Sequence, residues 1–156
     1  MASVFFPMET QQQSQWCWAA VSVSTASYYG DPAWSQCALV NAELGETGCC
    51  ANGASSACNQ PWSLQAALTR VGHLSSFSLG RLGERDTEAQ IAAGRPVAVR
   101  IDWGDGTGHF VVVSGMEPDD IVTVEDPLNG TFSGPYSSFA AAYLGSGSWS
   151  HTYLTA

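Results

Sequence analysis

Apolar residues in the first part of the chain recur at spacings of three and four, and they predict a helix over residues 15–29. Ser14 suits its N-cap, because a serine hydroxyl can accept a hydrogen bond from an amide of the first turn. Gly30 suits the position just past the end, and Pro32 prevents the helix from continuing. The spacing predicts one buried stripe, formed by Trp16, Ala19, Ala20, Val23 and Ala26.

A helical pattern also marks three shorter segments, at 61–71, 87–93 and 137–144. Gly72 ends the first of them. Asp86 or Thr87 opens the second, and Gly94 closes it. Residues 31–61, rich in Gly, Asn, Ser and Ala, predict a loop with one short helix.

The period changes in the second half of the chain, where short runs of β-branched residues alternate with turn residues. These runs predict antiparallel strands at 97–103, 109–116, 121–125 and 148–154. The segments GDGTG (104–108) and EPDD (117–120) suit hairpin connections. Helices followed by antiparallel strands predict an α+β fold of two layers around one core, and the length suits a single domain, 1–156.

The charge balance excludes several classes of partner. Asp and Glu number 14 against five Arg and no Lys, and the net charge is −9. Nucleic acids and anionic membranes both attract basic surfaces, so we expect neither as a partner. No apolar run approaches the length of about 18 residues that a spanning helix needs. No dinucleotide or phosphate-binding motif is present, so we expect no cofactor, and we expect a monomer.

Four of the five cysteines lie close together in the predicted loop: Cys37, Cys49, Cys50 and Cys58. Clustered cysteines in a loop-rich segment indicate two disulfides and an oxidising location. Adjacent Cys49 and Cys50 cannot readily bond each other, so each would reach Cys37 or Cys58. A Cys₄ zinc site and unpaired thiols are the alternatives, although zinc sites usually use paired C-x₂₋₄-C motifs. Because disulfides would handicap folding in the cytosol, we expect a secreted or otherwise exported protein. Its opening residues lack a signal peptide's basic region, so we expect that its leader or pro-segment is absent from this chain.

The fifth cysteine, Cys17, is a candidate nucleophile. With Ser14 as the cap it would be the third helical residue, near the positive end of the helix macrodipole, where the thiolate is favoured. Flanking Trp16 and Trp18 would limit access of water. The alternative is a small buried hydrophobic residue, since free cysteines are commonly interior.

A cysteine nucleophile needs a base, and His73, His109 and His151 are the candidates. His109 begins a predicted strand after a glycine-rich turn, which would hold the imidazole rigidly while leaving its approach open. Asp126 ends the next predicted strand, so a hairpin would bring it beside His109, where it could orient the ring. A surface histidine and a turn-opening aspartate are the alternatives.

An oxyanion hole needs hydrogen-bond donors near the nucleophile. Gln11, six positions before Cys17, could place its side-chain amide beside the Cys17 backbone N–H. Its neighbours Gln12, Gln13 and Gln15 could be confused with it. Gln, Cys, His and Asp in this order form a specific constellation.

This constellation resembles that of the papain-like cysteine proteases. The matching residues are Gln11, WCWAA (16–20), GHF (108–110) and DP (126–127), and RPVAVRIDW (95–103) before GHFVVVSG (108–115) is typical as well. The bacterial branch typified by the avirulence protease effectors of plant pathogens is the most similar. That branch also has Q-C, C-C and C-N elements, matched by Gln36-Cys37, Cys49-Cys50 and Cys58-Asn59.

The resemblance implies a papain-like fold, in which a helix carrying the nucleophile packs against an antiparallel sheet carrying the base. It implies Cys17 as nucleophile, His109 as general base, Asp126 as orienting residue and Gln11 in the oxyanion hole. Plant papains have Asn in the third role, so Asp126 follows the bacterial branch. The expected activity is hydrolysis of a polypeptide substrate through a thioester. Acyl transfer, deconjugation and a catalytically silent binding module are the alternatives.

Two aspartates just before His109 give a further hypothesis. Asp102 and Asp105 would bias the cleft toward cationic or neutral peptides, or they would serve only as turn residues.

Overall fold

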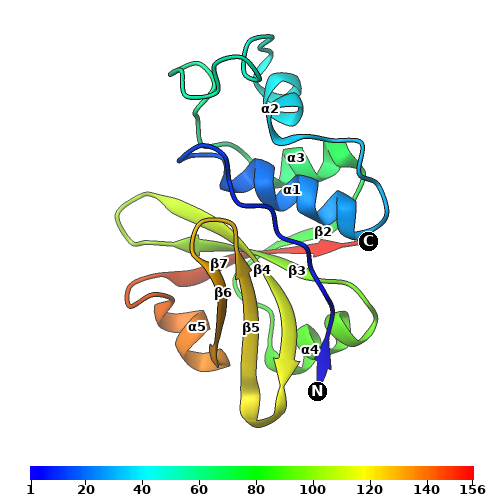
Figure 1. Ribbon diagram of the computed structural model, residues 1–156. Coiled ribbons are helices and arrows are strands. Elements are labelled where there is room, and N and C mark those ends of the chain that lie inside the picture. Colours follow the sequence, from blue (N-terminus) through cyan, green and yellow to red (C-terminus); the bar gives the residue numbers. More distant parts are fainter.

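The computed structural model describes all 156 residues, and it contains one antiparallel sheet with helices on both faces (Figure 1). The elements in chain order are β1 (Ala2–Ser3), α1 (Cys17–Tyr28), α2 (Gln36–Leu44), α3 (Leu64–Val71), β2 (Leu74–Leu79), α4 (Glu84–Ala92), β3 (Val97–Asp102), β4 (Gly108–Glu117), the 3₁₀ turn η1 (Pro118–Asp120), β5 (Ile121–Asp126), β6 (Gly130–Pro135), α5 (Tyr136–Ala142) and β7 (Ser148–Thr155). The predicted α+β class is confirmed.

The strands are ordered β2-β7-β3-β4-β5-β6, and neighbouring strands are antiparallel. Strands β3, β4, β5 and β7 correspond to the four predicted from the sequence. The two edge strands, β2 and β6, were not predicted. Each of these strands has a neighbour on one side only and buries little of its surface. Their sequences, LSSFSL and GTFSGP, therefore lack the alternating apolar residues from which a strand is predicted.

The sheet separates two apolar cores, so the predicted pair of layers around one core is wrong. Helices α1, α2 and α3 cover the face that presents Ala98, Phe110 and Val112. Helices α4 and α5 cover the opposite face, where Val99 and Val111 lie. Figure 1 shows the sheet lying between these two groups of helices. The alternation of strand residues buries both sides of β3 and β4.

Helix α1 is buried over most of its circumference instead of along one stripe. Every residue from Cys17 to Ala26 is buried, because α2 and α3 cover the side that faces away from the sheet. The hydroxyls of Ser22 and Thr25 remain satisfied in this interior, since each donates to the carbonyl four residues earlier. Gly30 follows the helix with φ of 85°, as predicted.

The start of α1 differs from the prediction. Ser14 is not the N-cap: the helix begins at Cys17, after a turn closed by the bond from Trp16 N–H to Gln13 O (3.1 Å). Ser14 Oγ accepts a hydrogen bond from the Asn59 side chain instead. Cys17 is therefore the first helical residue, not the third.

Two other helix starts also differ from expectation. Helix α4 begins at Glu84 behind Gly83, so neither Asp86 nor Thr87 opens it. Helix α3 begins later than predicted, because the Ser63 hydroxyl caps it by accepting the N–H of Ala66 at 3.0 Å.

The N-terminal segment crosses the molecule and contacts both the sheet and α1. Ala2 pairs with Met116 of β4, beyond the stretch of β4 that β3 covers. The backbone N–H of Glu9 donates to Ser24 Oγ at 2.9 Å, and that of Gln11 donates to the Pro127 carbonyl at 2.9 Å. In Figure 1 this dark blue segment runs from the lower end of the sheet to the start of α1.

No helix has both the length and the apolar character needed to cross a bilayer.

Candidate active site

A histidine and an aspartate form a buried pair near one end of the sheet. His109 is the second residue of β4, and Asp126 is the last residue of β5. Because these strands are adjacent and antiparallel, the start of one lies beside the end of the other. His109 Nε2 lies 2.8 Å from Asp126 Oδ1, and the two side chains are 7% and 0% exposed. The structure thus brings together two of the residues singled out from the sequence.

Four further hydrogen bonds fix the Asp126 carboxylate. Oδ1 also accepts the backbone N–H groups of Leu128 (2.8 Å) and Asn129 (3.0 Å). Oδ2 accepts the Asn129 side-chain amide at 3.0 Å and the Tyr143 hydroxyl at 2.8 Å. Both oxygens are therefore held by the protein, and the carboxylate has little freedom to turn away from His109.

The charges of this pair depend on each other. Burial alone would lower the pKa of His109, but the hydrogen bonds and charges of Asp126 and Cys17 raise it to about 9. Burial alone would raise the pKa of Asp126, but the hydrogen bond and charge of His109 hold it well below its usual range. Burial, and then the hydrogen bond to Asp126, raise the pKa of Tyr143. At neutral pH the site therefore holds an imidazolium, a carboxylate and a neutral phenol.

Cys17 approaches the same imidazole from the helical layer. Its hydrogen bond to His109 is one cause of the raised histidine pKa. Because Nε2 of His109 is bonded to Asp126, Nδ1 is the ring nitrogen that remains for the Cys17 sulfur. Cys17 is the only free cysteine and is 8% exposed. As the first residue of α1 it lies closer to the positive end of the helix than predicted, and its N–H lacks an acceptor within the helix.

An aromatic side chain covers the imidazole. Trp103, which follows β3, stacks on His109 with ring centroids 6.2 Å apart and an interplanar angle of 21°. Trp103 also stacks on Tyr143 at 6.3 Å. The indole therefore shields the His109–Asp126 pair, which strengthens their interaction.

Gln11 is buried beside the segment that leads to α1. Its Nε2 donates to the carbonyls of Gln13 (3.0 Å) and Ser14 (2.9 Å), while Oε1 is buried without a partner. Both N–H bonds of the amide are therefore engaged by the loop before Cys17. The expected contribution of Gln11 to an oxyanion hole stays a prediction.

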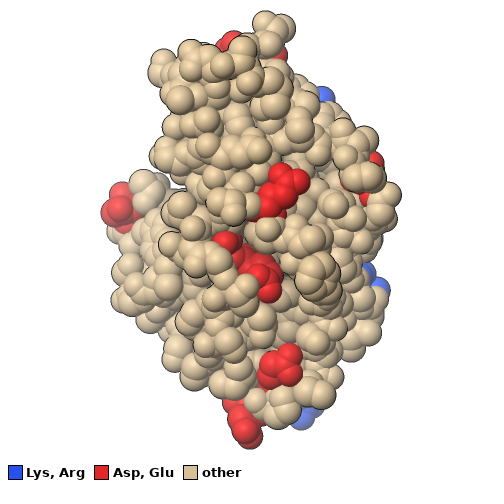
Figure 2. Space-filling view, viewed as in Figure 1, with Lys and Arg blue, Asp and Glu red and all other residues tan.

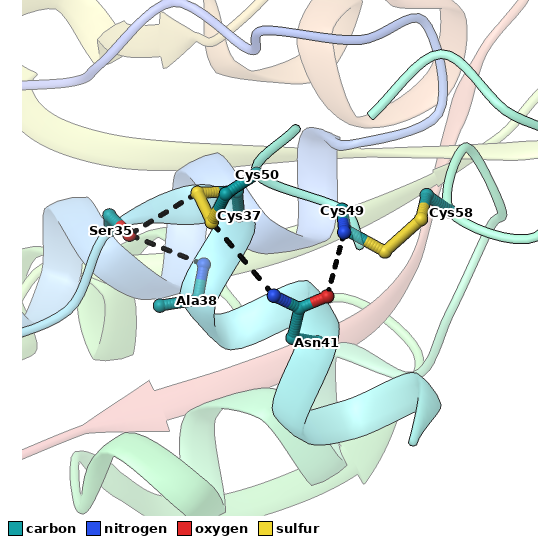
Figure 3. Close-up of a disulfide and its surroundings, with 7 residues drawn as sticks. All are labelled: Ser35, Cys37, Ala38, Asn41, Cys49, Cys50 and Cys58. Atoms are coloured by element: carbon teal, nitrogen blue, oxygen red, sulfur yellow. Dashed lines mark hydrogen bonds between the residues drawn. A yellow bond between two sulfur atoms is a disulfide. The ribbon is translucent and has the colours of Figure 1, made fainter. Parts of the chain in front are cut away.

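Two disulfides cross-link the segment after α1, as predicted, and they exclude the zinc site and the free thiols that were the alternatives. Cys37 pairs with Cys50, and Cys49 pairs with Cys58. Figure 3 shows both bridges around Asn41, whose side chain accepts the Cys49 N–H at 2.9 Å. The adjacent cysteines thus reach in opposite directions, one to helix α2 and one to the end of the loop.

The chain just after Cys58 holds the residues on either side of the nucleophile. The indole N–H of Trp16 donates to the Cys58 carbonyl, and that of Trp18 donates to the Gln60 carbonyl, both at 2.9 Å. The Asn59 side chain makes two more bonds, to residues 14 and 15. The segment 58–60 therefore positions the start of α1 through four hydrogen bonds.

The other two histidines lie elsewhere. His73 Nδ1 contacts the carbonyl of Ala156 at 2.8 Å, and His151 stacks on Phe77. No group of three or more His, Cys, Asp or Glu side chains is arranged to hold a metal ion.

Sequence reasoning missed the residues that support Asp126. Asn129 lies three residues after Asp126 in the sequence DPLN. A turn directly after the strand allows its side-chain amide to hydrogen-bond back to the Asp126 carboxylate, so this signal was available. Tyr143 and Trp103 carried no local signal, because their contacts join segments distant in the sequence.

The family model described as "Peptidase_C39 like family" matches residues 5–153. The chain belongs to this family, and it is accordingly a protease of the cysteine peptidase class. No curated protein sequence matches it.

A solved structure shows the same fold. The chain is similar to a double glycine motif protease from an AMS/PCAT transporter, solved in complex with the leader peptide, with a TM-score of 0.60 and 17% identity over 99% of this chain and 94% of that one. It also matches the Pseudomonas avirulence protein AvrPphB, with a TM-score of 0.43 and 11% identity over 97% of both chains. The predicted papain-like cysteine protease fold is confirmed.

Proposed function

We propose that this protein hydrolyses peptide bonds with Cys17 as the nucleophile, His109 as the general acid and base, and Asp126 as the residue that orients the imidazole. The observation that carries this proposal is the buried His109–Asp126 pair, which faces the single free cysteine at the start of α1. The 156 residues act as one peptidase domain.

The reaction begins from a Cys17 thiolate and a His109 imidazolium. The sulfur attacks the scissile carbonyl carbon, and the carbonyl electron pair moves onto oxygen to form an oxyanion. His109 gives its Nδ1 proton to the leaving amine, and the C–N bond breaks to leave a thioester. Water then gives a proton to His109 and attacks the thioester, which releases the acid and the thiolate.

The oxyanion requires donors at the start of the helix. The Cys17 N–H is one, since helix geometry leaves it without an intrahelical acceptor. Gln11 supplies the second. Its amide would exchange a carbonyl acceptor, Gln13 or Ser14, for the stronger charge of the oxyanion.

The substrate is a polypeptide. The structurally similar double glycine motif protease was solved in complex with the leader peptide, which supports a polypeptide substrate for this chain. The protein functions in an oxidising compartment, because its two disulfides would be reduced in most cytosols.

Alkylation of the native protein tests the proposal. Without reductant, iodoacetamide can reach one free thiol, so intact mass gives the rate at Cys17 directly. We expect rapid labelling of the wild type, slow labelling of His109→Ala and unchanged labelling of the control His73→Ala. A peptide pool should be cleaved by the wild type but not by Cys17→Ala. Equal labelling of the wild type and His109→Ala, or cleavage by Cys17→Ala, would contradict the assignment.

A further inference from the structure

A pocket of about 240 Å³ lies where the helical layer meets the hairpin between β3 and β4. Its lining comes from the segment before α1, from the chain after the second disulfide and from the hairpin: Gln15, Pro61, Trp62, Arg100, Gly106, Thr107, Gly108 and Phe110. Two of these residues place it beside the candidate active site. Gln15 stands two positions before Cys17, and Gly108 directly precedes His109. A polypeptide lying across the active site would therefore pass this pocket.

Arg100 is the only charged residue of the lining. It lies on β3 opposite Phe110, and its side chain is 25% exposed. Its guanidinium packs against Gly108, where a Cβ would come within 2.6 Å of the Arg100 Cζ. Any larger residue before His109 would displace the guanidinium, so this glycine allows Arg100 to reach the pocket.

The charge of Arg100 is only partly balanced by the protein. Its Nη1 donates to Ser150 Oγ at 3.1 Å, and the nearest carboxylate oxygen, from Asp102, is 4.0 Å away. Asp102 is also committed to its own turn, where Oδ1 accepts the Gly104 N–H. The guanidinium has five N–H donors, so it keeps donors for a ligand.

A second pocket, of about 780 Å³, contains an arginine whose charge is balanced within the pocket. Arg70 lines it together with Glu43, and the two side chains form a direct ion pair. That cation is already matched by a carboxylate of the same pocket, whereas the lining around Arg100 contains no acidic residue. The surface seen in Figure 2 carries scattered acidic groups, with basic atoms only near its margin.

We propose that this pocket is a specificity subsite for a carboxylate of the substrate, carried by an Asp or Glu side chain near the scissile bond or by the end of the polypeptide, and that Arg100 binds it. This inference rests on the proposed peptidase function. It differs from the preference for cationic or neutral peptides considered from the sequence, and the carboxylates of Asp102 and Asp105 accept turn amides, as in the alternative given there. An arginine fork pairs with a carboxylate by two parallel hydrogen bonds, which gives selectivity as well as affinity.

Cleavage of a peptide library by four forms of the full chain tests the subsite. They are the wild type, Arg100→Gln, Arg100→Glu and the control Arg85→Glu, which makes the same charge change at an exposed position of α4. Each peptide is prepared with a free and with an amidated C-terminus, and products are identified by mass spectrometry. The rate of Cys17 alkylation in each variant shows whether the active site remains assembled.

We expect wild-type cleavage to favour Asp or Glu at one position near the cut, and Arg100→Gln to lower kcat/KM for such peptides about tenfold. Arg100→Glu should favour Lys or Arg at that position, and Arg85→Glu should match the wild type. A preference lost on amidation would identify the terminal carboxylate as the ligand.

Cleavage without an acidic preference, or the same preference in Arg100→Glu, would overturn the subsite alone. Absence of cleavage and of rapid Cys17 alkylation in the wild type would overturn the peptidase proposal and this inference together.

Discussion

The two halves of the candidate active site are held in place by different means. The sheet half, with His109 and Asp126, is fixed by the register of β4 and β5 and by a buried carboxylate with five hydrogen bonds. The helix half, with Cys17, is held by the irregular segment 58–60. One disulfide anchors this segment at Cys58, and all three of its residues accept hydrogen bonds from the start of α1. The sheet half therefore depends on a charged pair held between two regular strands. The helix half depends on a disulfide and on hydrogen bonds between uncharged groups.

This difference means that the two halves should respond to different perturbations. A change of pH acts on the sheet half, because its geometry depends on the charges of His109 and Asp126. Reduction acts on the helix half, because segment 58–60 is anchored at Cys58. Changes of pH and removal of a disulfide should therefore affect the two halves separately.

The largest effect is expected for the nucleophile. Cys17→Ala should lower kcat/KM by about 10⁴-fold or more, since no other group forms the thioester. Gln11→Ala should lower it by about 10²- to 10³-fold, the usual loss for one oxyanion donor. Steady-state kinetics on one cleaved peptide measures both. Similar residual rates for the two variants would contradict their separate roles.

The sheet half should show a characteristic pH dependence. The imidazolium is lost as the pH rises through the His109 pKa of about 9, so wild-type kcat/KM should fall above that value. Asp126→Asn weakens the hydrogen bond and removes the charge by which residue 126 helps to raise this pKa, so the alkaline limb should move to lower pH. Activity at pH 7 should fall by about 10- to 100-fold.

The same proton contributes to folding, which gives a second measurement. The folded pKa of His109 lies above its unfolded value of about 6.5. The contribution to stability is therefore complete below pH 6.5 and lost as the pH rises through about 9. The melting temperature of the wild type should fall over this interval more than that of Asp126→Asn, and parallel curves would contradict the coupling.

The helix half should respond to loss of its disulfide. The double variant Cys49→Ser/Cys58→Ser should lower the free energy of unfolding by about 2–4 kcal/mol. It should also lower kcat about tenfold, because segment 58–60 no longer positions the helix start. Urea unfolding and steady-state kinetics measure the two effects.

The other disulfide supplies a matched control. Cys37→Ser/Cys50→Ser should lower stability by a similar amount but leave kcat closer to the wild type, since neither residue adjoins the segment that contacts α1. Equal loss of kcat in the two double variants would show that the loop acts as a whole.

The smallest effect is expected for Tyr143→Phe, which removes one of the two bonds to Asp126 Oδ2. The free energy of unfolding should fall by about 1–2 kcal/mol, because the lost bond is to a charged acceptor. Asn129 remains bound to the same oxygen, so kcat/KM should change by about threefold or less. Urea unfolding checks the first value, and a kinetic loss as large as that of Asp126→Asn would contradict the second.

The sequence was most informative where structure follows from local pattern. Strands β3, β4, β5 and β7 are short runs rich in β-branched residues with turn residues between them, so they and their hairpin connections were predicted. His109 and Asp126 could be expected to meet because a hairpin brings the relevant strand ends together.

The parts that could not be predicted depend on contacts distant in sequence. The edge strand β2 forms only because β7, the last element of the chain, pairs with it. Ser14 had the residue type of an N-cap, but the hydrogen bond from Asn59 and the turn ending at Trp16 moved the helix start to Cys17. From the sequence, Arg100 was one of five arginines between positions 70 and 100 and had no assigned role; the fold places its guanidinium beside Gly108.

The N-terminal segment limits how far the helical layer can move from the sheet. It is fastened to β4 at Ala2, to α1 through Glu9 and to the end of β5 through Gln11. The helical layer cannot move away from the sheet unless this segment detaches from one of the two, so the layers are not joined by a free hinge. The start of α1, which carries Cys17, and the end of β5, which carries Asp126, should therefore stay at a fixed separation while the segment remains bound.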